Sequence, residues 1–569
     1  MPPDPPTAVG ARRLLALAAI AVTAAVFTPL AVIRVDPHHD GIMLKTALDV
    51  LSGQRLFRDT FTQYGPLTTY VHVAAMWAFG PGLLVLKLVT VAAYALSAGV
   101  LTAVWARILP VPLVVGSVVV WLLLAPFYGV VWPLQPWSSA VALLFQALSL
   151  AAFACALDGT RLRGWAAVSG ACAALAVWAR TPVGLAHTGA LVAAFVYVAR
   201  AARRRDVLTT GLGSFGLGAL ATHLAFFGVL VAHDTVPQWF EQTIVGPATW
   251  AQTKSAGLRD ALAQLFPGPA SLIRLDGFAR WRTWWNAGVA VGLVASWVAV
   301  LAAWRPTAGV LLVVASSLVA AVVMLADPFL LTTAQALALA IPIAALALAG
   351  GGIVRLVRSS PSEPTAVRAV AFALAMLASW LQYFPTSDPQ HVFWAAAPGV
   401  GLPLYALFRL TGRRSAPVLV VAGILLLPLA VVRVLDARAL VAGEWVAIDR
   451  VPVLAGLRAS AADADEYTRL WEAIHAYGTR RPDVPMVVVG GHALVATFAP
   501  SLRNPGPYFV QWASAMKLDA GTLDRFITRE RALVLVEPID RAVIARFARD
   551  LGYRELIRTP GRAVLAPAE

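Results

Sequence analysis

Two polar segments near the amino terminus organise this sequence: Val35-Asp36-Pro37-His38-His39-Asp40-Gly41, and Leu56-Phe57-Arg58-Asp59-Thr60-Phe61-Thr62-Gln63-Tyr64-Gly65-Pro66-Leu67. The first segment directly follows the first long apolar run. Three carboxylates, two histidines and an arginine therefore gather in one loop of a chain that is only 13% charged. They could simply hydrate a loop, but the spacing of the two segments argues against this interpretation. We therefore expect the chemistry of the protein here.

The residues between these two segments have the pattern of a short amphipathic helix over 42–56. Its apolar positions are Ile42, Leu44, Leu48 and Leu51, and its polar positions are Lys45, Asp49 and Gln54. Such a helix lies in the membrane interface with its apolar face buried. It would hold both polar segments at the membrane surface.

The composition defines the class of protein. With 569 residues, 59% of them hydrophobic, and a mean hydropathy of +0.73, the chain is a polytopic membrane protein. The net charge of +15 comes largely from arginines in short loops, which indicates membrane topology and not a nucleic-acid partner. Cys155 and Cys172 fall inside apolar segments, which excludes a disulfide framework and a thiolate metal site.

Apolar segments of about 20 residues, each long enough to cross a bilayer, recur along the first 435 positions and number about thirteen. They lie near 14–34, 82–106, 111–131, 138–157, 165–182, 184–200, 207–232, 286–304, 308–326, 335–353, 367–384, 393–411 and 417–435. The first has no convincing cleavage site and is predicted to be a retained helix.

Loop charges predict the orientation, because cytoplasmic loops collect Lys and Arg. One set of alternate loops holds Arg12-Arg13, Arg107, Arg161, Arg163, Arg203-Arg204-Arg205, Arg305, Arg355, Arg358, Arg413 and Arg414. The amino terminus is then cytoplasmic, in a multi-pass protein of the cytoplasmic membrane. The acid-rich loops face outward, and the two largest of them cover 35–81 and 233–285.

The amino-acid composition changes after about residue 436. Half of the acidic residues lie in 441–569, and no segment there could span a bilayer. Short β-rich runs at 486–490 and 532–537 alternate with helical patterns at 465–477 and 540–551. We therefore expect a transmembrane module over 1–435 and a small extracytoplasmic α/β domain over 436–569.

The two opening segments resemble the first outer loop of GT-C membrane glycosyltransferases, in the bacterial branch akin to protein O-mannosyltransferases and lipid A aminoarabinose transferases. That loop typically runs Asp-Glu-Gly, helix, Gly-x-x-x-Tyr-Arg-Asp-Phe, Gly-Pro-Leu. Here the corresponding parts are His39-Asp40-Gly41, 53–61 and Gly65-Pro66-Leu67. Arg180 in 175–184, the Asp388-Pro-Gln-His391 element with Pro398 behind it, and the tail at 487–508 extend the resemblance.

One departure from the family pattern is that His39 replaces the first of two tandem acids. A polyprenyl-phosphate sugar transferase needs a base near the acceptor and cations near the departing phosphate. The resemblance and the residue types make Asp40 the first candidate for the base and Asp36 the second. The candidate donor-binding residues are Arg180, His391, Asp388 and Arg58, supported by His39, Asp59 and Tyr64. Asp59 is expected to act mainly as an ion-pair partner that fixes the loop.

The resemblance implies transfer of a sugar from a polyprenyl-phosphate donor to a glycan, lipid or protein of the cell envelope, with inversion. No cofactor and no metal are expected, although His38, His39 and Asp40 are possible ligands. A lipid-linked sugar flippase and a glycan polymerase or ligase remain alternatives. High Ala, Val, Arg and Trp usage is typical of a GC-rich, actinobacterial genome, where arabinose or mannose donors are natural candidates.

Overall fold

The computed structural model describes residues 9–125, 134–159, 161–248, 331–358, 363–383, 389–489, 493–498, 520–537 and 540–568. Within these ranges, eight helices are long and apolar enough to cross a membrane. A helix pair bent by 46°, Gln390–Gly399 with Gly401–Leu410, would make a ninth span. The predicted spans 286–304 and 308–326 lie outside the described residues.

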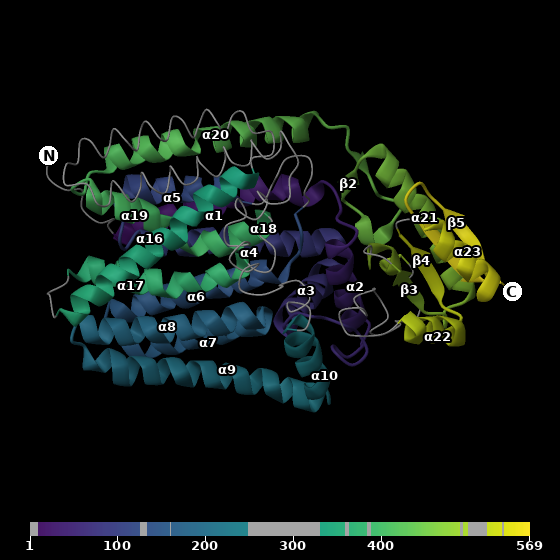
Figure 1. Cartoon of the computed structure of the whole chain (residues 1–569), viewed down its shortest axis with the longest axis horizontal. Coiled ribbons are helices and arrows are strands. Elements are labelled where there is room, and N and C mark those ends of the chain that lie inside the picture. Colours follow the sequence, from purple (N-terminus) through teal and green to yellow (C-terminus); the bar gives the residue numbers. More distant parts are fainter. Residues whose placement is uncertain are drawn as a thin grey trace, which may run out of the picture.

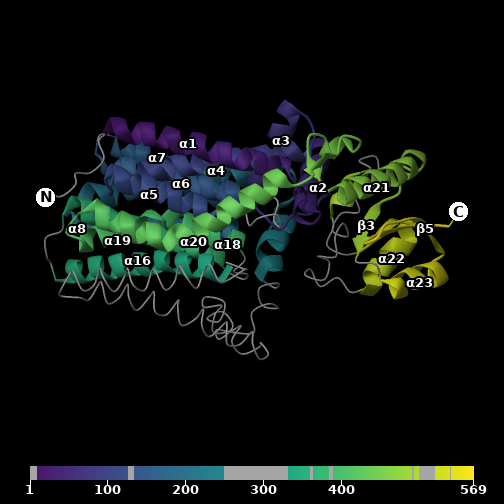
Figure 2. The same ribbon diagram turned by 90° about the horizontal axis from the view of Figure 1, so that it is seen from above.

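These helices form an elongated bundle (Figures 1 and 2). Its members are α1 (Val9–Val32), α4 (Leu83–Trp105), α5 (Val111–Leu124), α6 (Ser138–Leu157), α7 (Leu162–Ala179), α8 (Thr181–Ala201), α9 (Leu212–Ala232), α16 (Leu331–Val357), α17 (Pro364–Leu377), α18 (Pro389–Ala396), α19 (Gly401–Leu410) and α20 (Ser415–Ala442). Helix α20 continues past the expected domain boundary at residue 435. The polytopic helical fold expected from the apolar runs is confirmed.

Small residues let the helices of the bundle approach closely, as is usual in membranes, where packing replaces hydrophobic collapse. A Cβ atom on Gly170 of α7 would lie 1.9 Å from the carbonyl oxygen of Phe215 in α9. A Cβ on Gly218 of α9 would lie 2.0 Å from the carbonyl oxygen of Ala167. The two backbones therefore touch at both positions, where no larger residue fits.

The C-terminal α/β domain lies at one end of the bundle, beyond α2 (His39–Leu51) and α3 (Pro66–Phe79) (Figures 1 and 2). Its sheet has the order β3-β4-β6-β5, with β3 and β4 parallel and the other pairs antiparallel. The strands are β3 (Met486–Val489), β4 (Leu533–Val536), β5 (Tyr553–Arg558) and β6 (Ala563–Pro567), and the helices are α21 (Ala461–Arg480), α22 (Ala520–Glu530) and α23 (Arg541–Asp550). The expected small sheet is thus present.

The C-terminal part of the chain holds the loop between α1 and α2. The backbone N–H of Arg34 donates to the carbonyl of Arg458, 2.7 Å away, beside the small strand pair β1 (Val446–Ala447) and β2 (Arg458–Ala459). The N–H of Leu494, in the short helix η7 (Ala493–Thr497), donates to the carbonyl of Pro37 at 2.9 Å. Helix α2 is therefore clamped between the bundle and the C-terminal domain.

This clamp changes the surroundings expected for the amphipathic helix. Lys45 and Asp49, which the pattern placed on a hydrated face, are buried in α2 and form an ion pair with each other. Thr60 also donates a hydrogen bond to Asp49 at 3.0 Å. The sequence pattern shows one apolar face, but it does not show that the polar face is buried as well.

We predict that Gly41→Ala disrupts this contact, because a Cβ there would lie 2.0 Å from the backbone nitrogen of Leu494 and 2.5 Å from the carbonyl carbon of Ala493. Two backbones must separate, which costs about 1–3 kcal/mol in a packed interior. We expect a lower Tm and faster proteolysis around 493–498. Gly189→Ala is the control, since its Cβ would meet nothing within 4 Å. Equal behaviour of the two variants would contradict the clamp.

Candidate functional site

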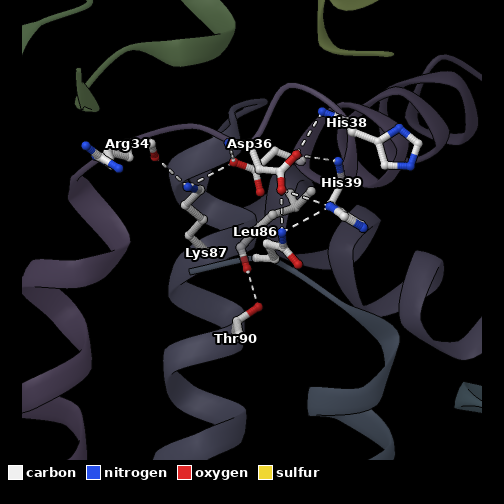
Figure 3. Close-up of polar contacts among 9 residues, drawn as sticks. Arg34, Asp36, His38, His39, Leu86, Lys87 and Thr90 are labelled. Atoms are coloured by element: carbon white, nitrogen blue, oxygen red, sulfur yellow. Dashed lines mark hydrogen bonds and ion pairs between the residues drawn. The ribbon is translucent and has the colours of Figure 1, made fainter. Parts of the chain in front are cut away.

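Asp36 lies at the centre of a hydrogen-bond network in the loop before α2, where its carboxylate contacts several neighbouring groups (Figure 3). Its Oδ1 accepts the backbone N–H groups of His38 at 2.9 Å and His39 at 3.0 Å. Its Oδ2 lies 2.8 Å from Nδ1 of His39 and also contacts the side-chain amide of Gln135. This carboxylate therefore fixes the orientation of the His39 ring.

The imidazole of His39 projects from this network with its second nitrogen pointing away from Asp36 (Figure 3). The side chain is 30% exposed, and no described residue lies within hydrogen-bond distance of Nε2. The ring packs edge-on against Trp137, with centroids 4.6 Å apart. A carboxylate on one imidazole nitrogen and an open second nitrogen is the arrangement of an oriented general base.

Asp40 has a different environment, although it is only four residues further on. Its Oδ2 forms a 2.9 Å ion pair with Nζ of Lys87 and accepts the backbone N–H of Asp36 at 2.9 Å. Nζ of Lys87 also donates to the carbonyl of Arg34 at 2.7 Å. Both side chains are completely buried. Oδ1 of Asp40 has no hydrogen-bond partner within the described part of the chain.

The two carboxyls differ in acidity for physical reasons. Burial alone would raise the pKa of Asp36, but the hydrogen bonds from His39 and His38 hold that pKa well below its usual range. Burial raises the pKa of Asp40 to about 6 despite the ion pair with Lys87. Asp36 is thus a permanent anion that aligns His39, whereas Asp40 titrates close to neutral pH.

A row of aromatic and cationic side chains connects this loop to residues far along the sequence. Trp137 also packs against Tyr64, with ring centroids 5.0 Å apart. The Arg180 guanidinium interacts electrostatically with Tyr64 and lies 5.6 Å from the ring of Trp394. His391 contacts the same tryptophan, at a centroid distance of 5.2 Å. We call Asp36, His39, Trp137, Tyr64, Arg180, Trp394 and His391 the site row.

Elements from different parts of the chain position this row. Arg180 lies at the junction between α7 and α8, where Thr181-Pro182 begins the new helix, and its Nη1 contacts the hydroxyl of Ser139 at the start of α6. Burial raises the pKa of Tyr64 to about 12, although the nearby Arg180 lowers it, so Tyr64 is a neutral hydrogen-bonding group. The row therefore combines an oriented imidazole, a phenol and a cation.

Two other expected site residues lie apart from this row. Arg58 is 43% exposed and lies 4.0 Å from Asp234. Asp59 accepts the backbone N–H of Arg55 at 2.8 Å and forms a 3.4 Å ion pair with the side chain of the same residue. Asp388 lies outside the described residues.

Sequence reasoning missed Lys87, Gln135, Trp137 and Trp394. Lys87 had a usable signal, since an ionisable residue within an apolar span marks a site by default and implies a nearby partner. Gln135 and Trp137 stand in a short link between two apolar runs. Nothing in the sequence places them against His39.

Metal-binding groups are sparse in the described ranges, where no cluster of three or more His, Cys, Asp or Glu side chains could hold an ion. The rings of His38 and His39 are 4.7 Å apart and edge-on. In Figure 3 the His38 ring points away from Asp36. Adjacent residues thus diverge instead of converging on one point.

Comparison with protein-family models and with curated proteins finds no match. Among solved structures, the chain is similar to ArnT from Cupriavidus metallidurans bound to undecaprenyl phosphate, at 15% identity and a TM-score of 0.41, covering 98% of each chain. It is also similar to the apo Archaeoglobus fulgidus oligosaccharyltransferase, at 13% identity and a TM-score of 0.49, covering 92% of this chain and 69% of the other. Both similarities extend over at least 92% of this chain.

Proposed function

We propose that this protein is a membrane glycosyltransferase that moves a sugar from a polyprenyl-phosphate donor to a hydroxyl group of an envelope glycan, lipid or protein. The observation that carries the proposal is the site row, which joins an oriented imidazole at one end to Arg180 and His391 at the other. An acceptor hydroxyl needs a base, and a departing phosphate needs positive charge. The row supplies both at one end of the bundle.

The proposed reaction is a single displacement at the anomeric carbon. Nε2 of His39 accepts the proton of the acceptor hydroxyl. At the same time, the oxygen of that hydroxyl forms the new bond to the anomeric carbon. The bond from the anomeric carbon to the phosphate oxygen breaks, and the electron pair leaves with the polyprenyl phosphate. Arg180, with His391 beside Trp394, stabilises the charge on the leaving phosphate. One displacement inverts the anomeric centre, and no step uses a cofactor.

This assignment differs from the bases expected from the sequence, Asp40 and Asp36. The fully buried Asp40 is paired with Lys87, so an acceptor hydroxyl has no approach to it. Asp36 already accepts several hydrogen bonds and binds a proton weakly. We therefore assign Asp36 to orienting His39, and Asp40 with Lys87 to positioning the loop. The imidazole occupies the place of the family's first acid.

The proposed location is the outer face of the cytoplasmic membrane. Arginines in alternate loops indicate a cytoplasmic amino terminus. Helix α1 leads from there to the loop with Asp36, next to the C-terminal domain (Figure 2). The site row then lies on the outer side, where envelope acceptors are.

The phosphate part of the proposal predicts that Arg180→Ala weakens the binding of undecaprenyl phosphate by roughly 10- to 100-fold, the value of a lost charge-assisted contact. Titration of the purified chain, followed by native mass spectrometry, measures this. Arg58→Ala is the matched control, because it removes an arginine that the structure places beside Asp234.

Equal affinity of the Arg180→Ala and wild-type proteins would remove Arg180 from the donor site. Strong loss in Arg58→Ala instead would move that site to the loop near Asp234. Lipid binding by Arg180-dependent contacts, without sugar transfer to any acceptor, would favour the carrier alternative over the transferase.

A further inference from the structure

A pocket that contains two arginines and two tyrosines lies at the opposite end of the bundle from the site row. It has a volume of about 120 Å³, well above the roughly 10–15 Å³ needed by one water molecule. Its walls come from the ends of α8, α16 and α19 and the start of α17. Along α8, Tyr197 of this pocket is 17 residues from Arg180, or ~25 Å at the helical rise.

Positive charge dominates the pocket. Arg355 and Arg409 both line it. Arg409 forms a 2.8 Å ion pair with Glu363, which Arg413 also contacts. Arg355 makes no ion pair or hydrogen bond with any described residue. The carboxylate of Glu363 is thus shared by Arg409 and Arg413. The positive charge of Arg355 is available to an anionic ligand.

A buried hydroxyl points to the same kind of ligand. Tyr405 lines the pocket, and its side chain is 2% exposed. Its hydroxyl lies beside the guanidinium of Arg409, which is its hydrogen-bonding neighbour in the pocket. A hydroxyl that accepts from an arginine can still donate its own proton to a ligand. An anionic oxygen could accept from Tyr405 and pair with Arg355.

Glycines keep the pocket open on the side of α16. Gly351 and Gly352 line it, and a Cβ on Gly352 would crowd Val370 and the hydroxyl of Tyr197. A Cβ on Gly351 would meet nothing within 4 Å, so it would project into open space. The neighbouring Gly350 is equally unobstructed but is not part of the lining. Larger residues at Gly351 and at Gly350 can therefore be compared, to test whether binding depends on space beside the lining residue.

The position of the pocket identifies the source of the anion. Arg355 lies in the last turn of α16, at the end of a candidate membrane span, whereas Ala347 and Leu348 extend the lining toward the apolar middle of that helix. A basic site above an apolar wall at helix ends fits a lipid headgroup with its chains below. We propose that this pocket binds the phosphate of an anionic phospholipid in the leaflet at this end of the bundle.

The experiment uses the full chain, purified in mild detergent, delipidated and titrated with phosphatidylglycerol, phosphatidylcholine or inorganic phosphate. Native mass spectrometry counts the bound molecules. We expect one saturable phosphatidylglycerol adduct. Its apparent affinity should fall roughly 10- to 100-fold in Arg355→Ala and in Gly351→Leu. Gly350→Leu, on the same helix, and Arg358→Ala, directly after its end, lie outside the lining and should bind like wild type.

Several outcomes would overturn the proposal. Unchanged binding in both Arg355→Ala and Gly351→Leu would show that lipid does not use this pocket. Equal affinity for phosphatidylcholine would remove the preference for a net negative headgroup. Full competition by millimolar inorganic phosphate, with no advantage for the lipid, would assign the pocket to free phosphate. None of these measurements uses glycosyl transfer, so the lipid site is tested independently of the proposed reaction.

Discussion

Replacing His39 by Gln is expected to lower the rate of sugar transfer by ~10²–10⁴-fold, the usual contribution of a general base. Glutamine keeps a polar side chain near Asp36 and Gln135 but does not accept the proton of the acceptor. Polyprenyl-phosphate mannose and polyprenyl-phosphate arabinose are the donors to assay. Undecaprenyl phosphate should bind to this variant as to wild type, because Arg180 is untouched.

Two companion variants separate orientation from proton transfer. Asp36→Asn should also lower transfer, because it weakens the acceptor that holds Nδ1 of His39 at 2.8 Å. His39→Glu should recover part of the activity, since it restores the tandem acids found in the family pattern. A wild-type rate in His39→Gln, together with an inactive Asp40→Asn, would transfer the role of base to Asp40. If every variant also retained lipid binding, only the assignment of the base would be wrong, and the donor site would be unaffected.

The second large effect is expected on stability, from Lys87→Met. This change leaves Asp40 buried with its main cationic partner removed, and breaking a buried ion pair in this way costs about 3–5 kcal/mol. The double variant Lys87→Met with Asp40→Asn should regain most of the loss, because it removes the unpaired charge as well. Thermal unfolding in detergent, followed by tryptophan fluorescence, measures the difference. A single variant as stable as wild type would contradict the buried pair.

The pH dependence gives an independent check of the same pair. Burial raises the pKa of Asp40 to about 6, so the folded chain binds this proton more tightly than the unfolded chain does. The stability that comes from the proton is fully present below the ordinary carboxyl pKa of about 4 and is lost as the pH rises through about 6. Asp40→Asn should flatten the stability profile in this window. An identical profile in the variant would show that Asp40 does not titrate there.

Much of the fold follows from the sequence, because a bilayer requires long apolar helices. The β-rich runs near 486 and 533 likewise predict strands through their local composition. The sequence predicts the long apolar segments well but the ends of their helices less well. Helix α20, for example, extends to Ala442, beyond the predicted end at residue 435. The terminal apolar positions of a span and the first turn beyond it have the same composition.

The site was only partly predictable, because its geometry depends on pairings across the chain. The resemblance pointed to the loop with Asp36 and to Arg180, and the structure places both in the site row. It could not show that Lys87 seals Asp40, because an ion pair between α2 and α4 leaves no local pattern. The choice between a carboxylate and an imidazole base depends on burial, which the order of residues in the loop does not reveal.

The clamp on the α1–α2 loop has a consequence for biosynthesis. Proteins generally begin to fold from the amino terminus as they are made. Here the loop with Asp36 is held by backbone bonds to Arg458 and Leu494, which are synthesised long after it. A nascent chain that has inserted its first helices still lacks those partners. These two bonds can therefore form only after residue 494 has been synthesised, and a prematurely terminated product would contain Asp36 and His39 in a loop that lacks both bonds.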